Sequence, residues 1–166
     1  MRKIVYTRLD GGVSVVTPVR NALGETQILM PASGEAKEVF REIQDAEIEQ
    51  RAWDKLPVDA INPRWADASE VLADRTFRNA WEDSGSVKVN MPKAREIHKD
   101  RLRQIRTPLL AALDIEYQRA DEQGDAVLKA QIAVKKQALR DVTKHSAITG
   151  AKTPDELKAA IPDVLK

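Results

Sequence analysis

The longest regular pattern of apolar and polar positions runs from residue 92 to residue 142 and is broken once, at 123–125. Apolar residues recur there in steps of three and four, which places them on one side of a helix with about 3.6 residues per turn. Before the break these residues include Leu102, Ile105, Leu109, Leu113, Tyr117 and Ala120, and after it Leu128, Ile132, Leu139 and Val142. A short break that contains glycine predicts an antiparallel helical hairpin. We expect a buried apolar seam between the two helices, in which residues of the first face residues of the second: Leu102, Ile105, Leu109 and Leu113 against Leu128, Ile132 and Leu139.

Pro108 lies inside the first of these helices. A proline in a helix interior removes a hydrogen bond and costs about 3 kcal/mol. Because the apolar spacing continues past Pro108, we expect a kink there and not an end. The alternative is a break, with Thr107 capping a new helix.

The N-terminal residues predict a β-hairpin. Two runs of β-forming residues, 3–8 and 13–18, flank Asp10-Gly11-Gly12. Such runs around Asp-Gly are a strong hairpin signal, with the turn at Asp10-Gly11 or Gly11-Gly12 and glycine supplying a positive φ. A two-stranded ribbon is marginal alone in water, so we expect a helix to cover it.

The covering helix is predicted to begin at Ser33 or Gly34 and to end near Leu56, before Pro57. Residues 21–34 read as a loop before it. The apolar stripe of this helix would be Ala36, Val39, Phe40, Ile43, Ala46 and Trp53.

The remaining segments are shorter. Residues 87–89 read as a strand or extended arm, and the aromatic residues Trp65, Phe77 and Trp81 suggest that residues 58–89 dock onto the head or the first long helix. After a polar loop, Thr153-Pro154-Asp155-Glu156 is a capping box that predicts a short final helix. The expected fold class is α+β and mostly α, with a head at 1–91 and the helical hairpin plus final helix at 92–166.

Composition narrows the possible functions. Aromatic residues make up only 4% of the chain, so the core must be built from Ala, Val, Leu and Ile. The net charge of +1 favours neither nucleic acid nor a membrane surface as a partner of the whole chain. The absence of cysteine excludes disulfides, thiolate metal sites and cysteine nucleophiles. No run is long enough to span a bilayer, and residues 4–8 are too short and polar for a signal peptide, so we expect a cytoplasmic protein.

No residue pattern indicates catalysis. His98 and His145 have no second ligand at metal-binding spacing, and the sequence has no phosphate-binding loop or nucleophile elbow. We therefore expect a non-enzymatic protein with no cofactor and no metal.

One basic cluster lies at the start of the first long helix. It comprises six basic residues against Glu96 and Asp100, a net +4: Lys93, Arg95, Lys99, Arg101, Arg103 and Arg106. This cluster could bind phosphate or an acidic protein surface. We favour a solvated face or an intramolecular partner, such as the acidic residues at 67–83, because no aromatic residue is interleaved for nucleic-acid stacking.

The first long helix also has a wide apolar arc. Leu110 and Ile115 lie off the main stripe. Because a wide arc is normally buried on more than one side, we expect contact with other chains, as a homo-oligomer or with a partner, through the Leu110 and Ile115 side.

Three segments carry a resemblance to a known group of proteins. Residues 73–81, 91–98 and 137–143, together with the N-terminal 5–13, resemble small tailed-bacteriophage and prophage proteins. The Gln-Ala-Leu-Arg-Asp sequence at 137–141 is similar to the C-terminal signature of phage tail-fibre assembly chaperones. The resemblance implies a tail- or virion-associated protein that acts through protein contacts, in the host cytoplasm during assembly or in the virion. The alternatives are a permanent virion subunit and a nucleic-acid-binding phage regulator that uses the basic cluster.

Overall fold

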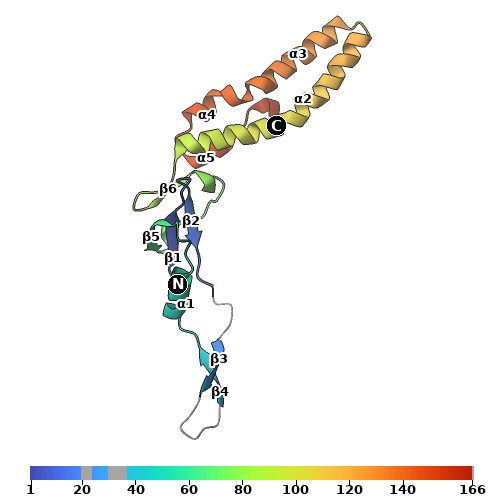
Figure 1. The fold of residues 1–166 in the computed structure, drawn as a ribbon. Coiled ribbons are helices and arrows are strands. Elements are labelled where there is room, and N and C mark those ends of the chain that lie inside the picture. The colour runs from blue at the N-terminus through green and yellow to red at the C-terminus, as the bar shows by residue number, and fades with distance from the viewer. Residues whose placement is uncertain (20–23, 30–36, 166) are drawn as a thin grey trace. The chain divides into compact units, whose positions relative to one another are not determined.

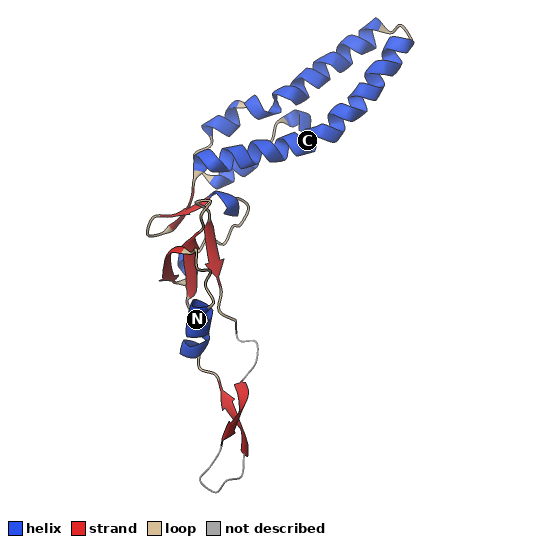
Figure 2. Ribbon diagram, in the orientation of Figure 1, coloured by secondary structure: helices blue, strands red, loops and turns tan. Residues whose placement is uncertain are grey.

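The computed structural model describes residues 1–19, 24–29 and 37–165. The chain is α+β and mostly helical, as the sequence predicts (Figures 1 and 2). It forms two compact units: the head unit, Met1–Arg75 with Trp81–Lys88, and the hairpin unit, Thr76–Ala80 with Val89–Lys166.

A three-stranded antiparallel sheet forms the centre of the head unit. Its strands are β1 (Lys3–Thr7), β2 (Val13–Val16) and β5 (Ile61–Ala66), in the order β2-β1-β5. The predicted N-terminal hairpin of β1 and β2 is confirmed, and the pairs run from Ile4 opposite Val16 to Thr7 opposite Val13.

The turn of this hairpin lies slightly earlier than expected. The Gly11 N–H donates to the Arg8 carbonyl at 2.9 Å, and the Arg8 N–H donates to the Gly12 carbonyl at 2.8 Å. Of the two glycines, Gly11 alone has a positive φ, of 74°. These features define a three-residue loop, Leu9-Asp10-Gly11, whose last position requires a left-handed backbone.

Helix α1 (Asp45–Asp54) contacts the head unit through two of its side chains, Glu49 and Trp53. The Arg2 backbone N–H and guanidinium both donate to the Glu49 carboxylate, at 2.8 and 2.7 Å. The hydrogen bond from the Arg2 side chain is the largest cause of the lowered pKa of Glu49, and the hydrogen bond from the Arg2 backbone N–H is the second. Trp53 of α1 stacks on Trp65 of β5 with ring centroids 5.2 Å apart.

The predicted helix from residue 33 or 34 is wrong over its first half. Strands β3 (Gly24–Leu29) and β4 (Lys37–Glu42) form an antiparallel hairpin where a loop and a helix were expected. The expected start at Ser33 or Gly34 lies outside the described residues. The spacing of Val39, Phe40 and Ile43 fits a helical face, but so short an apolar run does not distinguish a helix from a strand.

The segment after β5 contains short elements. The 3-10 turns are Ala68–Glu70 and Arg78–Ala80, and strands β6 (Trp81–Asp83) and β7 (Val87–Val89) form a two-stranded ribbon. The strand expected at 87–89 is therefore confirmed.

The hairpin unit contains the two predicted long helices. They are α2 (Met91–Glu122) and α3 (Ala126–Asp141), which lie antiparallel (Figure 1). The Asp125 carboxylate caps α3 by accepting the Leu128 N–H at 2.8 Å, and Gly124 has a φ of 70°. Helix α2 continues through Pro108, so the alternative of a break there is wrong.

The core of the hairpin unit lies at one end of the hairpin. Short helices α4 (Ser146–Gly150) and α5 (Pro154–Ala159) pack there, with α4 in the region expected to be a loop. The largest buried side chains of this core are Phe77, Leu102, Val142, Ile148 and Leu157.

His98 is buried in the same region and has a structural role. Its Nε2 atom hydrogen-bonds to the Ala160 carbonyl oxygen at 3.1 Å, and its ring lies edge-on to Phe77. This contact ties the end of α5 to α2.

Gly11→Val is expected to destabilise the head unit by about 1–2 kcal/mol, because a Cβ disfavours the left-handed backbone. No atom lies within 4 Å of the added Cβ, so a clash would not explain the loss. Gly11→Asn is the matched control, because asparagine tolerates this conformation better. Thermal denaturation measures both variants, and equal stability of Gly11→Val and the parent would contradict the loop assignment.

Candidate partner-binding surfaces

Most of the basic cluster is engaged within the hairpin unit. The Arg95 guanidinium donates to the Ala151 carbonyl at 2.8 Å. Arg101 donates to the Thr76 carbonyl, and its guanidinium carbon lies 5.2 Å from the centroid of the Phe77 ring. These bonds connect α2 to segments distant in sequence.

Three further basic residues of the cluster are also engaged, one with α3 and two within α2. Arg106 donates to the Arg140 carbonyl at 2.7 Å, which ties α2 to the end of α3. Arg103 pairs with Asp100, and Lys99 pairs with Glu96 at 2.8 Å. The cluster thus serves contacts within the hairpin unit, and its partners there are backbone carbonyls and acids of α2.

Leu110 and Ile115 do not form one surface. They are five positions apart, which at about 100° per residue separates them by roughly 140° around α2. Leu110 is half-buried, whereas Ile115 is 53% exposed. Leu110 and Ile115 therefore cannot belong to one partner-binding surface, and of the two only Ile115 is exposed to solvent.

Ile115 belongs to an exposed apolar stripe along α2. Ile105 and Leu109 are 47% and 40% exposed. With Pro108 and Ala112, which are also exposed, these residues recur at helical spacing on one side of α2. We call Ile105, Pro108, Leu109, Ala112 and Ile115 the α2 stripe.

The α2 stripe corrects the expected seam between the long helices. Leu102, Ile132 and Leu139 are buried as predicted. Ile105, Leu109 and Leu128 were expected in the seam, but each is at least 39% exposed. Two helices alone present a narrow interface, so residues beside it stay in contact with solvent.

Helix α3 has exposed apolar residues of its own. Val127 and Val134 are each 70% exposed and lie seven positions apart, on the side away from Ile132 and Leu139. Their regular spacing was visible in the sequence, but their exposure was not.

Another side of the hairpin is charged and satisfied internally. The Lys129 and Lys136 ammonium groups lie 5.3 and 4.8 Å from the centroid of the Tyr117 ring. Lys129 also pairs with Asp121, and Lys136 with Asp114 at 2.5 Å. The hydrogen bond to Asp121 is the largest cause of the raised pKa of Lys129.

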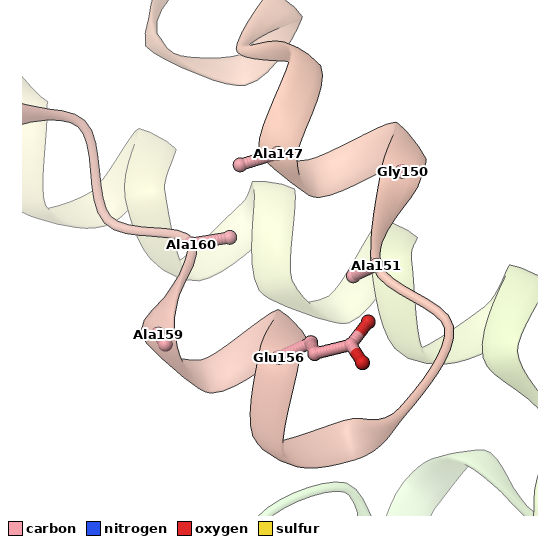
Figure 3. Close-up of a pocket in the computed structure, with 6 residues that line it drawn as sticks. All are labelled: Ala147, Gly150, Ala151, Glu156, Ala159 and Ala160. Atoms are coloured by element: carbon pink, nitrogen blue, oxygen red, sulfur yellow. The ribbon is translucent and has the colours of Figure 1, made fainter.

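A shallow hollow of about 350 Å³ lies between α4 and α5 (Figure 3). Its lining is almost entirely small residues: Ala147, Gly150, Ala151, Ala159 and Ala160. The only charged residue in the lining is Glu156, whose carboxylate accepts the Lys152 backbone N–H at 2.7 Å.

In the described ranges 1–19, 24–29 and 37–165, no group of three His, Cys, Asp or Glu residues could hold a metal ion. Among those residues, no helix combines the length and apolar character needed to cross a membrane. Comparison with known protein families, curated proteins and solved structures found no match.

The buried seam and the exposed α2 stripe predict different costs for leucine truncation. Leu139→Ala removes a side chain that is 3% exposed and should cost about 2–5 kcal/mol. Leu109→Ala removes one that is 40% exposed and should cost less than about 1 kcal/mol. Urea denaturation of both variants measures the difference, and equal losses would show that the α2 stripe is buried.

Proposed function

We propose that this protein is a non-enzymatic component of a bacteriophage tail or virion, which acts through contacts with other protein chains. The phage origin is supported by the resemblance of residues 73–81, 91–98 and 137–143 to phage and prophage proteins. The mode of action is supported by the exposed apolar residues of the hairpin unit.

The α2 stripe is the observation that carries this proposal. Its three large side chains, Ile105, Leu109 and Ile115, are 40–53% exposed. They lie within about three turns of one helix, in an arc of roughly 120°. Single exposed apolar residues are ordinary, but an aligned set is typical of a surface that binds another protein. A partner helix laid along α2 would cover all three.

The nucleic-acid-binding alternative has less support. A phosphate-binding face requires basic side chains that are free to reach the backbone of the nucleic acid. Arg95, Arg101 and Arg106 are instead bonded to carbonyl groups of the hairpin unit. We therefore favour a protein partner, which is either an assembly intermediate of the tail or a permanent virion subunit.

Ile115→Glu tests the surface. The side chain is 53% exposed, so the isolated protein should keep its helical content and melting temperature. A charge in an apolar interface is costly, so we expect the yield of infectious particles to fall about tenfold or more. Gln118→Glu is the matched control, because it adds the same charge to an exposed position on the same helix.

The two variants are compared in a phage or prophage that encodes the protein. Normal particle yield with Ile115→Glu would contradict the role of the α2 stripe. Mass spectrometry of purified particles then distinguishes a permanent subunit, present in fixed stoichiometry, from an assembly factor, which is absent.

A further inference from the structure

A pocket of about 230 Å³ lies against one face of the head sheet. Val15 is paired with Val5, and cross-strand partners project their side chains to the same face of a sheet. Lys3, two residues before Val5, therefore shares this face with Val15, and both line the pocket. The segment 68–75 and Trp81 of β6 provide the opposite wall.

The walls of this pocket are held in place by Arg64. Its guanidinium donates to both carboxylate oxygens of Asp83 on β6, at 2.9 and 3.1 Å. It also donates to Glu70 at 2.9 Å, in the segment that forms the wall. The hydrogen bond from the Asp67 N–H is the largest cause of the lowered pKa of Glu70, and the hydrogen bond from Arg64 is the second. The Glu70 carboxylate therefore stays charged and paired. The pocket is thus formed before any ligand arrives.

The charged residues that line the pocket are both basic. They are Lys3 and Arg75, and neither forms an ion pair within the part of the chain that the structure describes. The other lining is largely apolar, with Val15, Val71 and Leu72. A ligand for this site would combine an apolar group with a negative charge.

The pocket also adjoins an open sheet edge. Strand β2 is at the edge of the sheet. The Arg8 N–H donates to the Gly12 carbonyl, so Arg8 and Gly12 form a hydrogen-bonded pair, and every second pair along β1 and β2 is bonded in the same way. With Val5 opposite Val15, that alternation directs the backbone N–H and C=O of Val15 away from β1. These groups form a template for an additional strand.

The opposite edge of the same sheet is blocked. Strand β5 contains Pro63, which has no N–H to donate, and the preceding Asn62 has a left-handed φ of 48°. Both features interrupt strand addition. Of the two edges, β2 is therefore the receptive one.

We propose that the head unit binds an extended acidic segment of a partner protein, which adds as a strand to the edge of β2. One apolar side chain of the segment fills the pocket, and a carboxylate two residues away, on the same face of the added strand, binds Lys3 and Arg75. Side chains of an added strand alternate between faces, so one of them reaches the pocket while the backbone pairs with Val15. This site is separate from the α2 stripe and does not depend on the proposed function.

Trp81 provides an internal reporter. Its indole N–H is buried and has no acceptor among the described residues. A buried donor without a partner is unfavourable, so a ligand oxygen that reached it would be stabilised. The indole N–H resonance of Trp81 should therefore shift when the segment binds, and Trp81→Phe identifies that signal.

The test uses the full chain and a labelled peptide, acetyl-Gly-Thr-Asp-Val-Leu-Val-Asp-Thr, in a fluorescence anisotropy titration. Its central leucine and both aspartates lie on one face of an extended strand. Lys3→Gln with Arg75→Gln should weaken binding about tenfold or more, since each lost charge-assisted bond is substantial. Lys55→Gln with Lys88→Gln is the matched control, because it removes the same charge from exposed positions of the head unit. We expect it to change the affinity less than about twofold.

Two altered peptides separate the contributions. Replacing both aspartates by asparagine should weaken binding as much as the Lys3 and Arg75 substitutions do, and replacing the central leucine by proline should abolish it by removing a backbone donor. The proposal is overturned if the acidic peptide does not bind at millimolar concentration, or if the two double variants bind it equally. It is also overturned if 4-methylpentanoate binds as tightly as the peptide, because a small carboxylate then suffices without a strand.

Discussion

The apolar core around Phe77 and Leu102 is the constraint on which the hairpin unit depends. Helices α4 and α5 pack at that end, so α2 is covered there by more than one neighbour. Farther along, α2 packs against α3, and two helices bury only a narrow seam between them. The exposed α2 stripe follows from this arrangement, since its residues lie beyond the reach of the short helices. The hairpin unit thus combines a packed core at one end with an exposed apolar stripe on α2.

The sequence predicted the features that have strong local signals. Gly124 and the capping Asp125 marked the break between α2 and α3, and the glycines after Asp10 marked the first hairpin. The β3-β4 hairpin was missed because the spacing of Val39, Phe40 and Ile43 satisfies a helical stripe, while strand pairing depends on residues elsewhere in the chain. Propensity alone could not decide between these alternatives.

The candidate site was harder to predict than the fold. Leu110 and Ile115 were grouped because both are apolar and off the main stripe, but their angular separation around α2 divides them. Arg101 and Arg106 looked available for a partner because their acceptors are main-chain carbonyls of Thr76 and Arg140. Backbone acceptors have no signature in the sequence, so the intramolecular role of these arginines becomes visible only in three dimensions.

The chain crosses between the two units more than once. Thr76–Ala80 belongs to the hairpin unit, but the following Trp81–Lys88 returns to the head unit. Phe77 and Ala80 are 2% and 0% exposed in the core that α2 and the short helices form. A fragment that began at residue 92 would lose both side chains and leave Leu102 and Leu157 facing a void, which typically costs several kcal/mol. Each unit therefore includes part of the segment between β5 and α2, so neither unit is one continuous stretch of the chain.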